Sequence, residues 1–518
     1  MQRYEELIEV LEQKFSTNAL RYKGHSIWPL FRISLLYHGL QQTNSTVVGT
    51  SLSASSKGFK AKVGDVLSSL INLKNEYVLY SRFKKKTKDL NISEEISNDK
   101  MDVVFFYCQS HRNQNIDGLF SNNFLDPLYQ EIRRNYKCLL LEENNNPDTV
   151  KLPPFFPTVN VSVRLKKAEL KNAFTKLTDN LLLLFSLKKN EEVEGFTDLK
   201  KLLPQELQNT LFASDEFLRN QMEKILLYKD CFTTIFSKVQ PKVLVQTCYY
   251  HSLGVAINMA CAELNIKTVE MQHGVLEPMA FWNFNKQHIH KFPFLPQYFW
   301  LFDLDSCSVV RDWVADENKV VLGGNVWMHK MLKNTTVDHE LELSFHHTTS
   351  SYSYSVLLSM QPQPFLELPL FVYEFMKQRQ DILWLIRLHP RTVQTDKPKI
   401  VAWMKDKGLT NYELELSNKL PLPFLVQHIK VNITKFSSVV FDCALANVPT
   451  VFIDQYAEEI FSRDYKILWN SPMVRMALDL EQLKAAFIYH ETIIPSFDVH
   501  QYFGGGQYLE KFERIVTA

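Results

Sequence analysis

The chain has 518 residues, enough for two to four domains that each bury a core. Hydrophobic residues make up 45% of it, as in a globular protein, and 58 basic against 57 acidic residues leave a formal charge of +1. This balance argues against a dedicated nucleic-acid-binding protein. Seven cysteines without a CxxC pair favour free thiols in a reducing cytoplasm over a disulfide framework.

The first 100 residues predict a helical extension. Residues 1 to 18 alternate charged residues with leucines at helical spacing and lack the apolar stretch of a signal peptide. Residues 43 to 58 are rich in Ser and Thr and predict a loop or linker. No segment reaches about 18 uninterrupted apolar residues, so a membrane-spanning helix is not expected.

Two clusters of basic residues are candidates for peripheral contact with a membrane. The first, "SRFKKKTK", spans residues 81 to 88. The second consists of Arg164, Lys166, Lys167 and Lys171. Clusters of about four to eight basic residues bind anionic lipid head groups, and a solvated loop is the alternative interpretation.

From residue 101 the pattern alternates between strands and helices, which is typical of parallel α/β units. A polar loop is expected at residues 108 to 118, and residues 161 to 235 favour helices. The predicted strands are residues 102 to 107, 138 to 143, 242 to 248, 267 to 273, 296 to 302 and 319 to 325. Helices are predicted around residues 126 to 135, 251 to 265 and 307 to 314.

A second α/β domain is predicted after a polar stretch at residues 346 to 355. Its strands are predicted at residues 355 to 360, 382 to 388, 412 to 416 and 431 to 434, with helices at 369 to 379, 399 to 408 and 439 to 446. We therefore expect an α/β fold with two Rossmann-like domains facing across a cleft. The expected boundaries are 1–100 for the N-terminal extension, 101–328 for the acceptor domain, 329–500 for the donor domain and 501–518 for a C-terminal helix.

Ligands of open parallel sheets gather outside the carboxyl ends of the strands, so residues just past each strand are site candidates. In the first domain these are His111, Arg112, Tyr249, Tyr250, His251, Gln272, His273, Gly274, Gly323, Gly324 and Asn325. In the second they are Gln361, Arg387, His389, Pro390, Arg391, Ser437, Ser438 and Asp454. Each of them alone also fits an ordinary loop residue.

Ser437 and Ser438 fall where a helix is expected to begin. A hydroxyl there can cap the helix, and the unpaired amides and positive dipole suit a phosphate equally well. Arg387, His389 and Arg391 alternate as a strand ends, so all three point one way if the strand persists. Cationic groups meeting such a helix end predict a diphosphate site that needs no metal.

Three motifs in this order resemble a known family. "RLHP", followed by "FSSVVFDCALANVPTVFID", resembles the His-Pro and Ser-Ser motifs of GT-B-fold enzymes that build bacterial surface polysaccharides. These include sialyl- and Kdo-transferases, which use CMP-sugars, and the CDP-glycerol glycerophosphotransferases of teichoic acid synthesis. "VEMQHGV" is similar to the Gln-His-Gly of capsule and lipopolysaccharide transferases.

The resemblance implies a glycosyltransferase, independent of metals and cofactors, that moves a sugar from a nucleotide-activated donor, with a CMP-sugar favoured. The acceptor would be a glycan or lipid-linked molecule in capsule or lipopolysaccharide synthesis, and the location the cytoplasm or the inner face of the membrane. His389 would bind or protonate the donor phosphate, which Ser437 and Ser438 would hold. The further strand-end candidates for donor binding are Arg387, Gln361 and Asn325.

His273 would face the cleft from the acceptor half and is the first candidate for the general base. The acidic Asp/Glu-Asp/Glu-Gly motif of some sialyltransferases has no match here, and Glu270 is the second candidate. Strand alternation would place Glu270 and His273 on opposite faces until the turn at Gly274 breaks it.

Three alternatives stay open. They are a CDP-glycerol-type glycerophosphotransferase, a nucleotide-sugar 2-epimerase with the same two-domain fold, and a non-catalytic polysaccharide-binding protein. No metal site is expected, because HExxH is absent and His346 with His347 falls in the polar stretch. Asp303 and Asp305, after the predicted strand at 296 to 302, are the remaining metal candidates.

Overall fold

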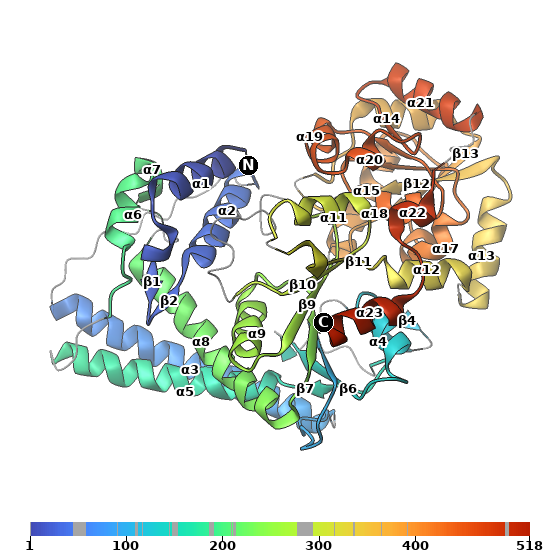
Figure 1. Cartoon of the computed structure of the whole chain (residues 1–518). Helices are drawn as coiled ribbons and strands as arrows, with labels where there is room; N and C mark the ends of the chain where they lie inside the picture. Colours follow the sequence, from blue (N-terminus) through green and yellow to red (C-terminus); the bar gives the residue numbers. More distant parts are fainter. Residues whose placement is uncertain are drawn as a thin grey trace.

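Two parallel β-sheets, each covered by helices on both faces, form two lobes of the molecule (Figure 1). The predicted fold class, two Rossmann-like α/β domains with helices at the N-terminus, is confirmed. The computed structural model describes residues 2–44, 59–90, 92–108, 112–116, 118–144, 146–147, 154–185, 191–208, 210, 214–276, 294–314, 316–334, 337–363, 365–390, 392–492 and 497–518. Of the loop predicted at residues 43 to 58, the first two residues end helix α2 (Trp28–Asn44) and residues 45 to 58 lie outside the described residues, as do the candidates His111 and Arg391.

The first sheet has seven strands in the order β11-β10-β9-β8-β3-β6-β7, with all neighbours parallel. The strands are β3 (Val103–Cys108), β6 (Cys138–Glu143), β7 (Val159–Asn160), β8 (Val243–Gln246), β9 (Lys267–Met271), β10 (Tyr298–Leu301) and β11 (Val320–Leu322). They are largely apolar because both faces of the sheet are buried. The chain proceeds outward from β3 to β7 and then restarts at β8, so the strand order reverses between β3 and β8.

The helices of the first lobe pack on both faces of this sheet. Phe106 points into a core formed with the N-terminal helices, α8 and α9, whereas Phe105 points into a core formed with α4 and the C-terminal helix α23. These helices are α1 (Gln2–Lys14), α2 (Trp28–Asn44), α4 (Asp126–Ile132), α8 (Asp215–Val239), α9 (Ser252–Glu263) and α23 (Tyr508–Thr517). The N-terminal helices therefore share a core with the first sheet.

Shorter elements complete the first lobe. They are η1 (Thr17–Ala19), β1 (Arg21–Tyr22), β2 (His25–Ser26), α3 (Phe59–Asp89), β4 (Arg112–Ile116), β5 (Leu119–Asn122), α5 (Ser162–Leu184), α6 (Phe196–Leu202), α7 (Gln205–Gln208), α11 (Leu304–Arg311) and η6 (Glu317–Lys319). The helical character predicted for residues 161 to 235 is confirmed.

The polar loop predicted at residues 108 to 118 is wrong in part, because β4 and β5 form an antiparallel hairpin there. Arg112 is buried in it, and its Nε lies 2.7 Å from Oε1 of Glu142 on β6. A buried cation needs a paired partner, and Glu142 supplies it from 30 residues away. Local sequence patterns do not contain that information.

The second sheet has six parallel strands in the order β14-β13-β12-β15-β16-β17. Its strands are β12 (Tyr354–Ser359), β13 (Ile382–Arg387), β14 (Tyr412–Glu413), β15 (Val431–Thr434), β16 (Thr450–Phe452) and β17 (Val474–Met476). The strand order reverses between β12 and β15, where ligands of such sheets are usually bound.

Helices of the second lobe likewise cover both faces of the sheet. They are α12 (Val326–Lys333), α13 (His339–Thr349), α14 (Leu370–Gln378), α15 (Val393–Asp406), α16 (Leu416–Lys419), α17 (Leu422–Val426), α18 (Val439–Leu445), α19 (Gln455–Asp464), α20 (Lys466–Trp469), α21 (Leu480–Thr492) and α22 (Val499–Phe503). None of the described helices is long and apolar enough to cross a membrane.

Two polar segments belong to helices that their composition did not predict. Residues 346 to 349, expected in a linker, end α13, which is anchored by buried Phe345 in edge contact with Phe424. The basic residues at 81 to 88 form the last turns of α3 and are not a loop. In both cases a helix is held by its packing on neighbouring elements, which composition alone does not reveal.

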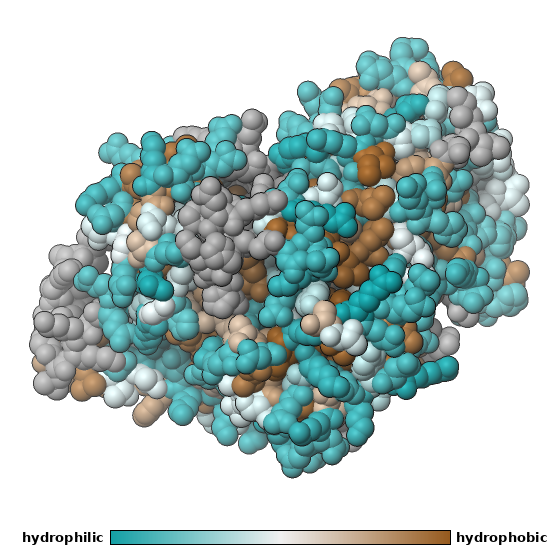
Figure 2. Space-filling view, in the orientation of Figure 1, coloured by the Kyte–Doolittle hydropathy of each residue, from teal (hydrophilic) through white to brown (hydrophobic). Residues whose placement is uncertain are grey.

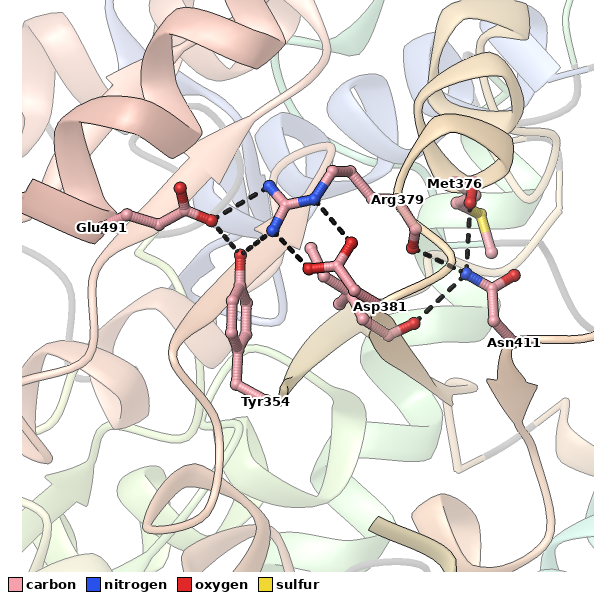
Figure 3. Close-up of polar contacts among 7 residues, drawn as sticks. Tyr354, Met376, Arg379, Asp381, Asn411 and Glu491 are labelled. Carbon is pink, nitrogen blue, oxygen red and sulfur yellow. Dashed lines mark hydrogen bonds and ion pairs between the residues drawn. The ribbon is translucent and has the colours of Figure 1, made fainter. Parts of the chain in front are cut away.

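Polar contacts at the outer end of the second sheet tie four of its elements together (Figure 3). Arg379 donates two hydrogen bonds of 2.8 Å to Asp381 and a third, of 3.0 Å, to Glu491 on α21. Buried Asn411 donates from Nδ2 to the carbonyl oxygens of Met376, Arg379 and Ile382, at 3.0 to 3.2 Å. Asn411 thus ties the end of α14 to the start of β13, adding a donor to carbonyls that also accept from the Gln380 side chain and the Ile382 amide.

Replacing Asn411 with alanine is expected to lower the free energy of unfolding by about 1 to 3 kcal/mol, because three buried carbonyl oxygens each lose a hydrogen bond. Replacing Arg379, whose ion pairs are partly exposed, is expected to cost about 1 kcal/mol or less. Urea denaturation of both variants measures the difference. Equal losses would show that the Asn411 contacts contribute no more than the surface ion pairs.

The two lobes are joined by several polar contacts. Asp305 of the first lobe accepts hydrogen bonds from the backbone amides of Ile467 (3.1 Å) and Leu468 (3.0 Å) and from the Tyr502 hydroxyl (2.9 Å). The Leu276 amide donates to the Tyr465 hydroxyl at 2.6 Å. Hydrophobic residues lie along the boundary between the lobes, whereas the outer surface is mostly hydrophilic (Figure 2).

Candidate functional site

A cavity of about 130 Å³ lies between the two lobes, at the carboxyl ends of both sheets. His273 reaches it from the end of β9, and Ser438 reaches it from the end of β15. Its lining residues are Asn123, Phe124, His273, Gly274, Phe302, Asn325, Trp327, Ser438, Phe441 and Asp442. Four of the sequence-predicted site residues, His273, Gly274, Asn325 and Ser438, thus meet in one cavity.

The His273 ring lies in a mixed polar and aromatic environment. Its Nε2 is 3.1 Å from both Cys248 Sγ and the Tyr250 hydroxyl, and its side chain is 19% exposed. The Phe124 ring and the imidazole are nearly perpendicular, and their centroids lie 6.1 Å apart. A histidine so placed is fixed in orientation and still reaches the cavity.

Glu270 lies behind His273 and is completely buried. Its Oε1 is 4.0 Å from His273 Nδ1, and its Oε2 accepts a hydrogen bond of 3.1 Å from the Tyr249 amide. Burial raises the pKa of Glu270 well above its usual value, and a positive His273 opposes that rise. Burial thus favours the neutral carboxyl, whereas a proton on His273 favours the carboxylate, so that the charges of the two residues are linked; Glu270 does not line the cavity.

The turn after β8 brings Cys248 and Tyr250 to His273. Cys248 adopts a φ of +61°, which is uncommon for a residue with a side chain. Gly254 in the first turn of α9 lies so close that a Cβ there would come within 2.6 Å of the Tyr249 Cα. His251, predicted as a site candidate, accepts a hydrogen bond of 3.1 Å from the Gly254 amide and caps α9.

Gln272 fixes the turn that carries His273. It is fully buried, donating from Nε2 to the Gly274 carbonyl (2.9 Å) and to Ser306 Oγ (3.0 Å). Its Oε1 accepts a hydrogen bond of 2.7 Å from the Phe302 amide at the end of β10. The Gln-His-Gly sequence thus combines a structural glutamine with a histidine at the cavity.

Asn325 connects the lobes at the cavity. Its Oδ1 accepts a hydrogen bond of 3.2 Å from the Met328 amide and caps α12, and its Nδ2 donates to Asp442 at 3.4 Å. The preceding Gly323 packs against the buried indole of Trp300, so closely that a Cβ would lie 2.0 Å from ring atoms.

The two serines have different environments. Ser437 Oγ accepts a hydrogen bond of 3.3 Å from the Val439 amide, as a helix-capping hydroxyl does. Ser438 makes no side-chain capping bond and lines the cavity. Both lie between β15 and α18, where the sequence predicted them.

Asp442 is a candidate site residue that sequence reasoning missed. Burial raises its pKa to about 7, although the positive charge of Arg387 opposes the rise. A carboxyl with a pKa near neutrality in a cavity is suited to give and take a proton. The signal was present, because Asp442 follows Ser438 by four residues and so shares one face of α18.

The raised pKa of Asp442 should make the free energy of unfolding depend on pH. The unfolded carboxyl ionises near pH 4 but the folded one only near pH 7, so the contribution of Asp442 to stability is fully present below pH 4 and is lost as the pH rises to 7. Asp442→Asn should therefore gain roughly 2 to 4 kcal/mol relative to wild type between those pH values. Chemical denaturation from pH 4 to 8 measures it, and a constant difference across this range would contradict the assignment.

The other predicted donor residues lie outside the cavity lining. Arg387 donates from one guanidinium nitrogen to the carbonyls of Ser417 (2.7 Å) and Leu420 (2.8 Å), and its burial lowers its pKa to about 10. His389 and Gln361 are half-buried residues of the loops after β13 and β12. Arg387 and His389 were expected to point toward one ligand. The guanidinium of Arg387 instead binds the carbonyl groups of Ser417 and Leu420, which lie at least 30 residues later in the chain.

The metal candidates have structural contacts. Asp303 caps α11 by accepting from the Ser306 amide at 2.8 Å, and Asp305 binds the backbone of α20. His346 and His347 lie on α13. Within the described residues, no group of three or more His, Cys, Asp and Glu side chains is arranged to hold a metal ion.

Solved structures of similar fold include two UDP-GlcNAc 2-epimerases and a polymerase. The epimerase from Methanocaldococcus jannaschii is 12% identical (TM-score 0.48), over 80% of this chain and 99% of that one. The epimerase from Neisseria meningitidis, bound to UDP-GlcNAc, is 11% identical (TM-score 0.47) over the same shares. The wall teichoic acid polymerase TagF is 14% identical (TM-score 0.44), over 89% of this chain and 98% of that one. No protein-family model and no curated protein sequence matches the chain.

Proposed function

We propose that the chain is a glycosyltransferase that moves a sugar from a nucleotide-activated donor, with a CMP-sugar favoured, to a glycan or lipid-linked acceptor of a bacterial capsule or lipopolysaccharide. The supporting observation is the cavity between the lobes, with His273 on one wall and Ser438 and Asp442 on the other. It lies where both parallel sheets present the carboxyl ends of their strands.

In the proposed reaction the second lobe binds the donor and the first lobe the acceptor. His273 takes the proton of the acceptor hydroxyl, and the oxygen forms a bond to the anomeric carbon of the sugar. The bond between that carbon and the phosphate oxygen breaks, and the nucleotide leaves with the electron pair. Buried Glu270 stabilises the positive charge on His273, because its Oε1 lies 4.0 Å from Nδ1.

The leaving phosphate is held at the second lobe. Ser438 donates a hydrogen bond to this phosphate. Asp442, whose pKa is about 7, donates a proton or a hydrogen bond in its neutral form, whereas an ionised carboxylate would repel the negative phosphate. His389 and Arg387, from the loop and end of β13, and Gln361 and Ser437 remain proposed contacts of the nucleotide. No metal ion or cofactor enters this scheme.

The cavity admits only part of a donor. Sites for ligands of this size usually measure about 300 Å³ or more, whereas the cavity measures about 130 Å³. We therefore expect the lobes to separate when a nucleotide sugar binds, stretching the 3.4 Å contact between Asn325 and Asp442.

Ser438→Ala is expected to weaken donor binding about tenfold or more, because a hydrogen bond to a charged phosphate is lost. Ser437→Ala is the companion variant: it removes a helix cap as well as a proposed nucleotide contact, and should lower the free energy of unfolding by about 0.5 to 2 kcal/mol. Isothermal titration with the donor and thermal unfolding separate the two effects. Unchanged donor affinity in Ser438→Ala would remove the serine from the phosphate site.

A further inference from the structure

An exposed, partly apolar and strongly basic surface lies on α3 and α5, remote from the cavity. The two helices run side by side along the lower edge of the first lobe (Figure 1). Asn180 on α5 donates to Ser69 Oγ on α3 at 2.7 Å, while Glu76 faces Glu169, so the helices are antiparallel. We call the outward faces of both helices the α3–α5 surface.

One end of the α3–α5 surface is apolar. On α3, Leu67, Leu70, Ile71, Tyr77 and Val78 recur at positions i, i+3, i+4, i+10 and i+11, which lie on one face of a helix. All five are exposed, Ile71 by 62%. On α5 and just after it, Phe174, Leu181, Leu182 and Phe185 are exposed as well. So many exposed large apolar residues on one helix pair indicate a binding surface.

The other end is basic. The last turns of α3 carry exposed Arg82, Lys84, Lys85 and Lys88, and the first turns of α5 carry exposed Arg164, Lys167 and Lys171. A groove of about 630 Å³ joins the two ends, lined by Leu73, Arg164, Lys167, Leu170, Lys171 and Phe174. Phe174 thus lines the same groove as three cationic side chains.

Acidic residues in the middle of both helices face inward, whereas Asp65 and Asp89, toward the two ends of α3, are exposed. Between Leu67 and Lys88 the only acid is Glu76, and between Arg164 and Thr178 it is Glu169. Glu169 is buried and bound to Lys166 at 2.6 Å, and Glu76 interacts with it across the helix pair. Among described residues, no acidic side chain forms an ion pair with Lys85, Lys167 or Lys171, so their charges are available to an anionic partner.

We propose that the α3–α5 surface docks on a lipid bilayer with anionic head groups. Its basic end matches their negative charge, while the exposed apolar side chains enter the boundary between head groups and acyl chains. A second copy of the chain would present the same cations and be repelled. The α3–α5 surface belongs to the first lobe, to which we assign acceptor binding. Its link to the acceptor rests on the proposed function, whereas the proposed docking on a bilayer does not.

Flotation with vesicles tests the charged end. The protein should bind vesicles of phosphatidylcholine and phosphatidylglycerol in equal amounts, bind pure phosphatidylcholine far less, and dissociate as salt rises. The triple variant Lys85→Gln, Lys167→Gln, Lys171→Gln should bind anionic vesicles roughly 100-fold more weakly. The matched control removes three exposed lysines of the second lobe, Lys377→Gln, Lys405→Gln and Lys430→Gln, and should bind like wild type.

A second pair of variants tests the apolar end. Ile71→Ser with Phe174→Ser should lower vesicle binding about tenfold at all salt concentrations, because less apolar area enters the bilayer. Leu343→Ser with Ile488→Ser removes similarly exposed residues of the second lobe and should have no effect. All four side chains are more than half exposed, so the variants should fold normally.

Three results would overturn the proposal: equal binding to neutral and anionic vesicles, binding that neither α3–α5 variant weakens, or a dimer in sedimentation velocity that only Ile71→Ser with Phe174→Ser dissolves. The last would assign the surface to a second copy of the chain. None of these measurements uses a donor or an acceptor, so the outcome is separate from that of the proposed sugar transfer.

Discussion

Replacing His273 with alanine is expected to lower the turnover of sugar transfer by about 10²- to 10⁴-fold and to leave the donor dissociation constant nearly unchanged. The imidazole would act on the acceptor proton, and the donor would be held by the opposite wall. Steady-state kinetics together with donor titration measure the two quantities separately. His389→Ala is expected to lower turnover and to raise the donor dissociation constant, because a phosphate contact exists before and during bond breaking.

Glu270→Gln serves as the companion variant for His273→Ala. Glutamine keeps the shape of the side chain but cannot carry the charge that stabilises a protonated His273, so turnover should fall less than in His273→Ala. If His273→Ala retains full activity and Glu270→Gln loses it, the general base is the glutamate. If neither variant affects turnover, the acceptor half of the proposed mechanism is wrong.

Gly323→Ala is expected to lower the free energy of unfolding by about 3 kcal/mol or more, the upper end of overpacking effects. The new Cβ would lie 2.0 Å from the indole of Trp300, which is completely buried and donates from Nε1 to the Gly324 carbonyl at 3.2 Å. The indole cannot move without opening the core, so the backbone leading to Asn325 must shift. Urea denaturation measures the loss in stability.

Gly64→Ala is the matched control for Gly323→Ala. Gly64 lies in α3, and a Cβ there has no atom within 4 Å. Its replacement by alanine should be neutral or stabilise by up to about 1 kcal/mol, since alanine is the better helix former. Equal midpoints for Gly323→Ala and wild type would show that the loop after β11 adapts to the added methyl group.

The α/β architecture could be predicted because its signals are local. A buried parallel strand such as Val103–Cys108 is a continuous apolar run, and the helix after Ser438 shows its period within seven residues. The β4–β5 hairpin and the end of α13 could not be predicted in this way. They depend on Glu142 and Phe424, which are distant in sequence.

The candidate site was predictable to a similar extent. Strand ends led to His273, Asn325 and Ser438, because the fold itself brings these positions together. Residue spacing places Asp442 on the same face of α18 as Ser438, but its raised pKa depends on burial, which spacing does not reveal. Arg387 was predicted to bind the donor because strand alternation places it beside His389. Alternation did not reveal that the carbonyl groups of Ser417 and Leu420 bind its guanidinium.

The most direct test of the proposed transfer is the release of nucleotide from a panel of CMP-, CDP-, UDP- and GDP-linked donors. We expect one nucleotide class to raise the thermal unfolding temperature and to be hydrolysed slowly. Release should accelerate when a glycan acceptor is added and be suppressed in His273→Ala. If no donor is bound or hydrolysed, or if a sugar epimer forms without any acceptor, the proposal that this chain is a glycosyltransferase is contradicted.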